Sequence, residues 1–533
     1  MPPAEFDYII VGAGSAGCVL ANRLSANESH RVLLLEAGGW DRNFWLKLPV
    51  GYYRSIFDKR YAREFLTQPS TGTAGRPISW PRGRVIGGSS SINGLIFIRG
   101  QREDFDDWER QGAAGWGYQS VLPYFRRLER YTGTPNQFRG AQGDFRVSDL
   151  RSNHPCCAAW VDAAQQYGLP RNADFNAETT FGVGPYQLSI GSRWRESASV
   201  AFLRPVLNRR NLTVIPNAHA TRILIEGNRA IGVEWASDRQ KHIASAQNEV
   251  ILSCGAIQTP QLLQLSGIGP AALLRKRGID VVADAPGVGE NLQDHYQART
   301  IVRLKKRQSL NDDVRNPVKL AQMGLQWLVN GSGPLTVGAG QTGGAACTEY
   351  ARNGRPDIQF MTMPLSADKP GNPLHRFSGF TALVWQCHPS SRGRLMIQSD
   401  DPFAPPRIEP NYLSEDIDQK IIVSGIKALR EIYRQPAFAN LWDEEVLPGE
   451  EVANDVDLLQ FAREQGGTVF HCCGTCRMGQ DDGAVVDPQL RVFGVDGLRV
   501  IDASVMPKIT SANTNAASIM IGEKGSAMVL GEM

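Results

Sequence analysis

The N-terminal part of the chain contains a strand–turn–helix–strand pattern that strongly restricts its fold. The apolar run from Phe6 to Val11 ends in the glycine-rich turn Gly12 to Gly17. Residues 16–24 then have the apolar spacing of a helix, and a second apolar run from Arg31 to Leu35 is closed by Glu36. This order predicts a βαβ unit, and therefore an α/β fold with parallel strands.

The glycine-rich turn reads GAGSAG, a pattern typical of dinucleotide binding. Gly12 permits the tight turn, Gly14 lets a pyrophosphate approach the backbone, and Gly17 lets the helix pack closely on the strand. The N-terminal N–H groups of that helix are expected to face the phosphates. Glu36 lies 19 residues beyond Gly17, where an acidic side chain accepts hydrogen bonds from a ribose. The pattern alone does not distinguish FAD from NAD.

The remaining strand signals are separated along the chain. Apolar runs at 249–253 and 498–501 resemble further strands of the first sheet, whereas 357–361 and 380–386 belong to a region of aromatic-rich strands and Pro- and Gly-rich turns. We therefore predict a Rossmann-like domain with an inserted α+β substrate domain built on a mostly antiparallel sheet. The predicted first domain comprises 1–155, 206–299 and 466–533, and the predicted substrate domain comprises 156–205 and 300–465.

Length and composition limit the other possibilities. The chain has 533 residues and a formal net charge of +3, with charges scattered rather than clustered, which argues against nucleic-acid binding. The N-terminus lacks the basic region of a secretory signal, and no run of about 18 apolar residues predicts a transmembrane segment. The nine cysteines show no disulfide spacing, so the predicted location is cytoplasmic.

Three further segments have distinctive sequences. Residues Gly83 to Arg102 read GRVIGGSSSINGLIFIRGQR, which is rich in glycine and small donors and predicts a loop whose N–H and hydroxyl groups face a ligand. Gly255 to Gly269 predicts a buried helix that stops at SGIGP, with little role in chemistry. His471 to Gly479 reads HCCGTCRMG and follows a glycine-rich bend.

Together with GAGSAG, these segments resemble the glucose–methanol–choline (GMC) family of FAD-dependent oxidoreductases, from about Phe6 to Lys524. The resemblance implies bound FAD and an alcohol substrate. Some family members tether FAD through a His immediately before the loop's Asn, but Ile92 stands there and cannot form that bond, so we expect non-covalent FAD. The cofactor-binding residues implied by the fingerprint and the resemblance are Gly12, Gly14, Ser15, Ala16, Glu36, Ala37, Arg84, Val85, Gly88, Ser89, Asn93, Gly94, Leu95, Ile96, Ala220, Asp502, Ala503 and Thr514.

The catalytic residues implied by the resemblance are His471 and Asn513. An imidazole with an ordinary pKa near 6.5 exchanges a proton near neutrality, whereas an amide can only orient a hydroxyl group. We therefore assign proton abstraction to His471 and positioning to Asn513, with Asn515 as a rival. A helix after Asn515, capped by Thr514 or Asn515, is expected to aim its positive end at the pyrimidine edge of the flavin.

Two other interpretations concern the cysteines and a second histidine. His471, Cys472, Cys473 and Cys476 have the residue types of a zinc site, but adjacent cysteines are poorly spaced and no second CxxC pair is present, so we predict no metal. His295, at the end of GVGENLQDH, is interpreted as structural.

The predicted function is oxidation of a primary alcohol to an aldehyde, with electrons passed to oxygen or another acceptor. Alternatives that stay open are an FAD-containing lyase resembling hydroxynitrile lyases, a flavin photodecarboxylase and a non-catalytic flavin-binding protein. The sequence does not name the alcohol. Five side chains of the predicted substrate domain either line its pocket or simply pack in its core: Phe360, Met361, Met363, Trp385 and His388.

Overall fold

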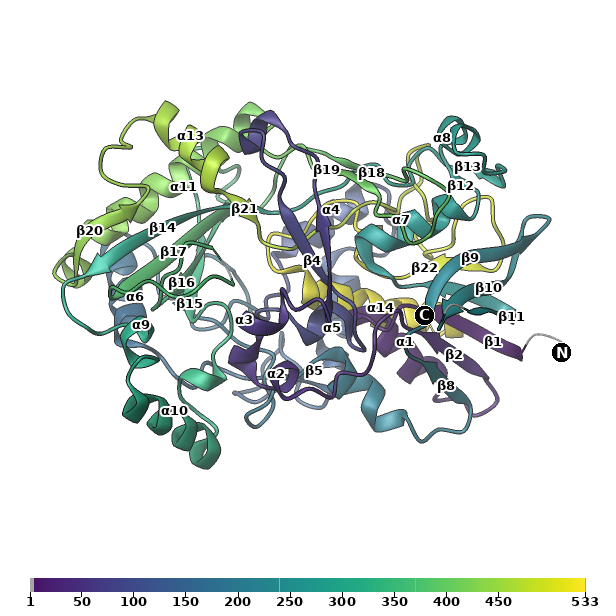
Figure 1. The fold of residues 1–533 in the computed structure, drawn as a ribbon, viewed down its shortest axis with the longest axis horizontal. Coiled ribbons are helices and arrows are strands. Elements are labelled where there is room, and N and C mark those ends of the chain that lie inside the picture. Colours follow the sequence, from purple (N-terminus) through teal and green to yellow (C-terminus); the bar gives the residue numbers. More distant parts are fainter. Residues whose placement is uncertain (1–3, 239, 370, 533) are drawn as a thin grey trace.

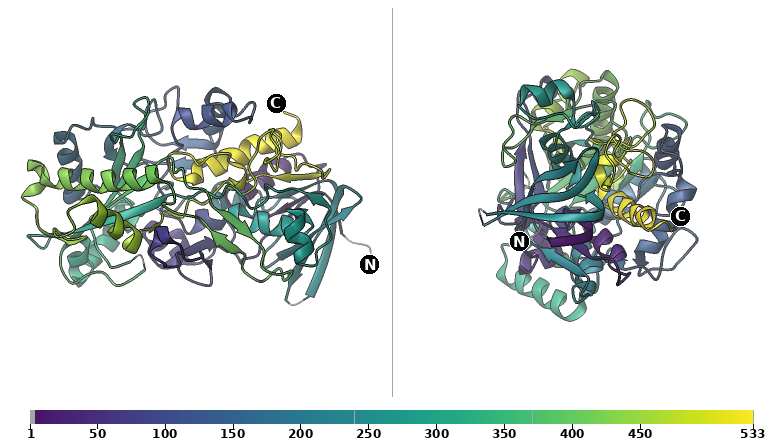
Figure 2. Two further views of the ribbon diagram at one scale, coloured as in Figure 1. Left: turned by 90° about the horizontal axis from the view of Figure 1, so that it is seen from above. Right: turned by 90° about the vertical axis from the view of Figure 1, so that its right-hand side faces the viewer.

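The computed structural model describes residues 4–238, 240–369 and 371–532. Two large sheets lie at opposite ends of an elongated molecule, with the hairpin of β3 (Ala62–Leu66) and β4 (Ser79–Gly83) and the N-terminal part of α14 (Thr514–Leu530) between them (Figure 1). The view from above shows the same separation, with the yellow helix α14 at the end that contains the chain's N-terminus (Figure 2, left).

The first sheet confirms the predicted βαβ opening. Its strand order is β8-β2-β1-β11-β10-β9, and β22 pairs with β11. The parallel strands β8, β2, β1, β11 and β22 carry the antiparallel pair β10 and β9 at one edge. The strands are β1 Ala4–Val11, β2 Val32–Leu35, β8 Leu212–Ile215, β9 His219–Glu226, β10 Arg229–Ser237, β11 Gln240–Leu252 and β22 Leu498–Val500, and α1 spans Ser15–Leu24.

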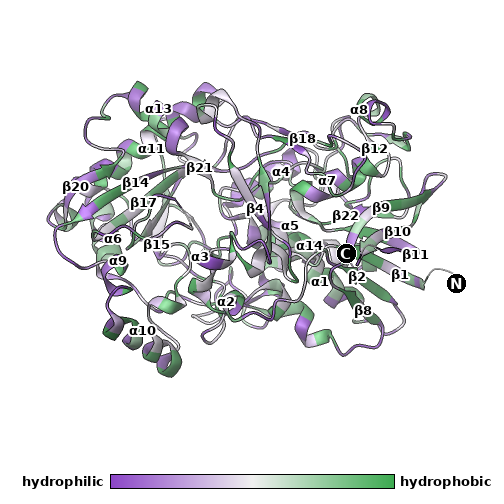
Figure 3. Cartoon of the chain, viewed as in Figure 1, coloured by the Kyte–Doolittle hydropathy of each residue, from purple (hydrophilic) through white to green (hydrophobic). Residues whose placement is uncertain are grey.

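The parallel strands bring separated segments to one edge. β1, β2, β11 and β22 run in the same direction, so the residues that follow them meet beyond their carboxyl ends. Val11, Leu35, Leu252 and Val500 are all buried, and the carboxyl-terminal ends of β1, β2 and β11 are apolar, as expected where a parallel sheet is covered on both faces (Figure 3). A ligand site at this edge is what a doubly wound sheet provides.

The second sheet is antiparallel, as predicted. Its order is β15-β16-β17-β14-β20, and β21 pairs with β14. α11 (Asp416–Arg434) packs against β17 through an apolar face that includes Ile422 and Ile426. The strands are β14 Tyr296–Leu304, β15 Thr342–Ala346, β16 Ile358–Met363, β17 Gly379–Gln386, β20 Trp442–Leu447 and β21 Gly467–Thr468.

Other elements surround these two sheets. The remaining longer helices are α4 Arg102–Arg110, α5 Tyr118–Leu128, α6 Pro155–Gln166, α7 Gly255–Leu265, α8 Ala271–Lys276, α10 Pro317–Asn330 and α13 Asp455–Gln465. The smaller strands are β5 Glu129–Tyr131, β6 Phe145–Val147, β7 Gly182–Pro185, β12 Ile268–Gly269, β13 Ala283–Asp284, β18 Arg394–Met396 and β19 Arg407–Glu409. Among the described residues, no helix combines the length and apolar character needed to cross a bilayer.

Two local features bear on the sequence-based predictions. β14 runs across the boundary drawn at residue 300, and it pairs with β21 from the C-terminal segment. The division into two domains at those boundaries therefore stays a prediction. The predicted cap of the C-terminal helix is wrong, because α14 starts at Thr514 and its N-cap residue is Asn513, whose side chain makes no capping bond.

Candidate active site

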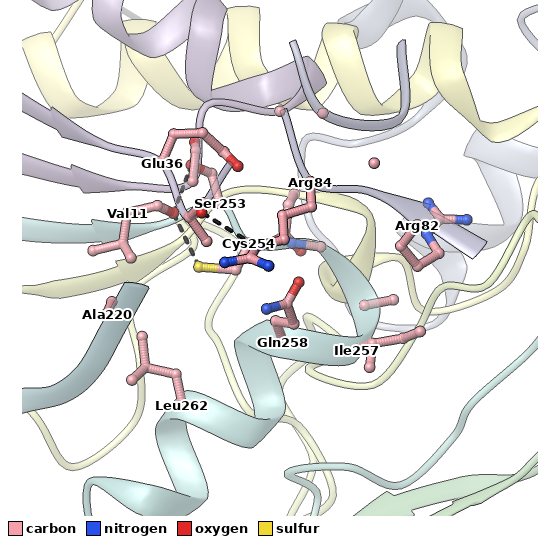
Figure 4. A pocket seen from close by; sticks show the side chains of 18 of the residues that line it. Val11, Glu36, Arg82, Arg84, Ala220, Ser253, Cys254, Ile257, Gln258 and Leu262 are labelled. Atoms are coloured by element: carbon pink, nitrogen blue, oxygen red, sulfur yellow. Dashed lines mark hydrogen bonds between the residues drawn. The ribbon is translucent and has the colours of Figure 1, made fainter. Parts of the chain in front are cut away.

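The first cavity of the site lies at the carboxyl edge of the parallel sheet, with an empty volume of about 1120 Å³. Figure 4 shows side chains from the ends of several strands and from α7 around it. Twelve of the predicted cofactor residues line this cavity: Gly12, Gly14, Ser15, Ala16, Glu36, Ala37, Arg84, Gly88, Ser89, Ala220, Asp502 and Ala503.

The glycines of the turn have different reasons to lack a side chain. A Cβ at Gly12 would lie 2.6 Å from the Ser253 carbonyl oxygen, and one at Gly17 would lie 1.9 Å from the Gly12 carbonyl oxygen. The nearest protein atom to a Cβ at Gly14 is 3.7 Å away, so the chain itself leaves room for a side chain there. Because Gly14 lines the cavity, its open space fits a phosphate group that approaches the backbone.

Two carboxylates fix the geometry of this cavity. Glu36 accepts hydrogen bonds from the N–H groups of Ala13 (2.9 Å) and Gly38 (2.8 Å), and burial raises its pKa to about 7. Figure 4 shows Glu36 and Arg84 on the wall of the cavity. Asp502 accepts from Gly255 N–H at 2.8 Å, which ties the end of β22 to the first residue of α7. These contacts connect segments of the cavity wall that are far apart in the sequence.

The second cavity, with an empty volume of about 1470 Å³, continues from the first. Both are lined by Ser15, Arg82, Ser89, Ala503 and Ser518, so one extended ligand fits along them. The predicted residues that line it are Asn93, Gly94, Leu95, Ile96, Thr514, His471 and Asn513, together with the shared Ser15, Ser89 and Ala503. Val85 lines neither cavity among the described residues, because it packs in a small core with Leu46 and Ile92.

The first turn of α14 faces the second cavity. Thr514, Asn515 and Ser518 contribute to the wall directly after Asn513. Free N–H groups at a helix N-terminus carry a partial positive charge. This end of α14 therefore favours a negative charge on a ligand in the cavity.

His471 is the centre of a chain of three polar side chains, His295, His471 and Asn513, of which the last two line the second cavity. Its Nδ1 lies 2.9 Å from Nδ1 of His295, and its Nε2 lies 3.0 Å from Nδ2 of Asn513. His295 Nε2 lies 3.0 Å from the carbonyl oxygen of Cys387. His471 is 7% exposed, and the described residues leave the Asn513 Oδ1 atom buried without a hydrogen-bond partner.

The direction of these hydrogen bonds follows from the Cys387 carbonyl. A carbonyl only accepts, so Nε2 of His295 carries the hydrogen. Burial lowers the pKa of His295 to about 4, which makes its ring neutral near pH 7 and leaves Nδ1 as an acceptor. His471 must then donate from Nδ1. Because burial also lowers the pKa of His471 well below its usual value, its Nε2 is unprotonated and accepts from the Asn513 amide.

The two candidate asparagines have different partners. Asn513 contacts His471, whereas Asn515 Oδ1 accepts a hydrogen bond from the Ser15 hydroxyl at 2.8 Å. Asn515 thus joins α14 to the GAGSAG turn, and Asn513 is the one next to the candidate base. This geometry favours Asn513 over its rival for the positioning role.

Sequence reasoning missed several residues of the site. His295 was interpreted as structural, yet its ring contacts the candidate base. The Asp294 carboxylate accepts a hydrogen bond from the backbone N–H of His471 at 2.7 Å. Arg82 lines both cavities and donates to the backbone carbonyl of Phe470 at 2.7 Å. The segment GVGENLQDH contains the first two, but nothing in it indicates a contact with a residue 176 positions away.

The residues considered for the substrate pocket divide by strand face. Met361 and Met363 line the second cavity from β16, whereas Phe360 points to the opposite face and is fully buried in the core of the second sheet. Trp385 and His388 are absent from the described wall, and the Trp385 ring lies 6.5 Å from that of His471. The described residues contain no group of three or more His, Cys, Asp or Glu arranged to hold a metal ion.

The comparison with protein families shows to which family the chain belongs. The N-terminal model of the GMC oxidoreductase family matches residues 6–297, and the C-terminal model matches residues 389–522. The chain belongs to the GMC oxidoreductase family. These two matches confirm the resemblance that was found in four segments of the sequence.

Curated relatives support the same assignment over nearly the whole chain. Human mitochondrial choline dehydrogenase is 41% identical over 539 residues, which cover 99% of this chain and 90% of that protein. The alcohol dehydrogenase [acceptor] of Pseudomonas putida is 39% identical, with 98% of this chain and 96% of that protein covered. The oxygen-dependent choline dehydrogenase of Photobacterium profundum is 40% identical, with 99% and 93% covered.

Solved structures agree with these relatives. Pyridoxine 4-oxidase from Mesorbium loti matches with a TM-score of 0.87 at 30% identity over 98% of both chains. Formate oxidase from Aspergillus oryzae, in which FAD modification has been described, matches with a TM-score of 0.93 at 26% identity, covering 100% of this chain and 99% of that one. The GMC oxidoreductase described here is therefore an FAD-dependent enzyme that oxidises the CH–OH group of an alcohol. None of these relatives supports the lyase alternative.

Proposed function

We propose that His471 is the base that removes the hydroxyl proton of a primary alcohol and that Asn513 holds the alcohol oxygen. The observation that carries this proposal is the hydrogen-bond chain His295–His471–Asn513, of which His471 and Asn513 line the second cavity. Because burial lowers the pKa of His471, its Nε2 is unprotonated near neutral pH and is available to take the hydroxyl proton. The Asn513 amide donates to the same oxygen as negative charge develops on it.

The predicted cofactor residues suit non-covalent FAD. The nucleotide part fits the first cavity beside Gly14 and Glu36, and the flavin fits the second cavity beside Asn93 and the first turn of α14. Ile92 is a buried hydrocarbon side chain in the second cavity and offers no atom for a covalent link. The flavin, when bound, accepts a hydride from the carbon that bears the hydroxyl group.

The product of a primary alcohol is an aldehyde, and we propose oxygen or another acceptor as the final recipient of the electrons. Oxidation of the alcohol by the flavin does not depend on which of these is used. The cytoplasmic location stays a prediction.

Anaerobic mixing of the FAD-loaded enzyme with primary alcohols tests the roles of the two residues. Replacing His471 with Ala removes the base, which contributes about 100- to 10,000-fold to proton-transfer steps. We expect flavin reduction to slow by that order while the flavin content stays unchanged. His242→Ala is the matched control, because His242 lies on β11 and lines neither cavity within the described walls. Reduction of the His471→Ala enzyme at the wild-type rate would refute the assignment.

A further inference from the structure

We propose that the second cavity selects alcohols that carry an anionic group, such as a carboxylate, at the end remote from the hydroxyl, and that Arg299 binds this group. The inference rests on the proposed function, because it takes His471 as the site of the hydroxyl group. It names a substrate class that differs from choline, the substrate named for two of the relatives above.

The charge of the cavity wall is the first observation. Its described residues include three cations, Arg82, Arg299 and Lys369, and no Asp or Glu. Arg82 lines both cavities and donates to the carbonyl of Phe470, the residue before His471, so it lies near the base and not at the remote end of the cavity. Arg299 and Lys369 are left to face the substrate, with Lys369 exposed and Arg299 half-buried.

The hydrogen bonding of Arg299 is the second observation. Its Nη2 donates to the backbone carbonyl of Asp368, whereas its Nε is buried without any partner among the described residues. No described carboxylate lies within 4.0 Å of this guanidinium, and the Asp368 carboxylate instead bonds to His375 at 2.9 Å and is 77% exposed. A partly desolvated guanidinium without an ion-pair partner within 4.0 Å is stabilised by an anion, since hydrogen bonds to charged groups are the stronger ones.

The position of Arg299 on the sheet separates the two ends of the substrate. Arg299 on β14 pairs with Leu383 on β17, and Leu383 pairs with Met361 on β16, so the three form one row across the cavity floor. Trp385, whose ring is 6.5 Å from that of His471, lies two residues away from Leu383 along β17. Two residues of a strand span roughly 7 Å. Gln297 pairs with Trp385, and Arg299 lies two residues beyond Gln297, on the side away from His295, which contacts the base. Arg299 therefore lies on the side of Trp385 that is remote from the base, and its partners in the row are apolar.

This arrangement of side chains fits a substrate that has a hydroxyl group at one end, an apolar spacer and an anionic group at the other end. Met361, Met363 and Leu383 would contact the hydrocarbon spacer. A quaternary ammonium group would face Arg299 and Lys369, whereas the Asp368 carboxylate near Arg299 is exposed and absent from the described wall, and like charges in one site are repulsive. An ω-hydroxy fatty acid fits both ends of the cavity, whereas choline fits only the hydroxyl end.

Three probes with matched chemistry test the inference: ω-hydroxydecanoate, its methyl ester and choline. We measure kcat/KM for turnover of the FAD-loaded enzyme without oxygen but with an added artificial electron acceptor that reoxidises the flavin. The acid should exceed the ester by about 10-fold or more, since one hydrogen bond to a charged group has that effect. Choline should be the poorest of the three substrates. Decanoate should also inhibit competitively, which tests the anion site without any chemistry.

Variants of two arginines on β14 separate recognition from folding. Arg299→Gln should lower the acid-to-ester ratio to about one, mainly through the KM of the acid, and should weaken inhibition by decanoate; Arg299→Lys should keep part of the ratio. Arg303→Gln is the control, because Arg303 lies on the same strand, pairs with Glu444 at 3.0 Å and is 44% exposed outside the cavity wall. It should keep the wild-type ratio.

The outcomes distinguish this inference from the proposed function. If the methyl ester reduces the flavin in a His471-dependent way but the acid has no advantage, the anion site is refuted and the base assignment stands. An Arg299→Gln enzyme that keeps the wild-type ratio would also refute the anion site. If none of the alcohols reduces the flavin of the wild-type enzyme, both proposals are overturned.

Discussion

Replacing His295 tests the reasoning about the tautomer of His471. His295→Phe keeps a flat buried ring but removes the acceptor 2.9 Å from Nδ1 of His471. The Nδ1–H of His471 is then buried without a partner, which costs about 1 to 3 kcal/mol. That cost favours the other tautomer, in which the hydrogen moves to Nε2 and the base is lost. At about 1.4 kcal/mol for each tenfold, flavin reduction should slow by roughly 5- to 150-fold.

The assay is anaerobic stopped-flow reduction at saturating alcohol, with flavin content measured for each variant. His295→Asn should recover part of the rate, because its side-chain carbonyl can accept from His471. A loss of folding alone would lower flavin content in both variants and would not be reversed by Asn. Wild-type reduction rates in His295→Phe, at full flavin content, would refute the tautomer argument.

Three further predictions concern the same site. Asn513→Ala should slow flavin reduction about 10- to 100-fold, because the alcohol oxygen loses one hydrogen-bond donor as it becomes charged. Asn515→Ala should instead lower mainly the flavin content. Equal losses of the reduction rate in the two variants would contradict this assignment. Since the pKa of His471 is depressed, kcat/KM should stay constant down through pH 6.5 and fall only at lower pH, and a fall centred at pH 6.5 or above would contradict it. Gly14→Ala should lower FAD content while the fold persists by circular dichroism, whereas Gly17→Ala should disrupt the fold.

The same buried histidines give stability a predictable dependence on pH. In the unfolded chain His295 and His471 bind protons near pH 6.5, but burial lowers the pKa of His295 to about 4 and that of His471 well below 6.5 in the folded protein. The unfolded state therefore binds more protons below about pH 6.5, and the free energy of unfolding should decrease as the pH falls through that range. Denaturant titrations of the wild type and of His295→Phe would measure this contribution, and an identical pH dependence in both would contradict it.

Much of the fold was predictable because its signals are local. Residues 16–24 form a helix and Gly12 a turn for reasons contained within a few positions, and the apolar run at 380–386 became β17 in the antiparallel sheet. The predicted cap residues, Thr514 and Asn515, were wrong because the helix begins earlier, with Asn513 as its N-cap residue. The side chain of Asn513 contacts His471, a residue 42 positions earlier, instead of capping its own helix. The preference of a residue type for the N-cap position does not take such a distant side-chain contact into account.

By itself, the sequence determined the nucleotide-binding turn, the family and the identity of the candidate base, since each depends on a short run of residues with a fixed chemistry. Only the tertiary structure decided which nitrogen of His471 is free, that His295 holds it in that state, and that Arg299 faces the substrate cavity. These properties depend on contacts between strands far apart in the chain. Burial and hydrogen-bond direction arise only when such segments are packed together.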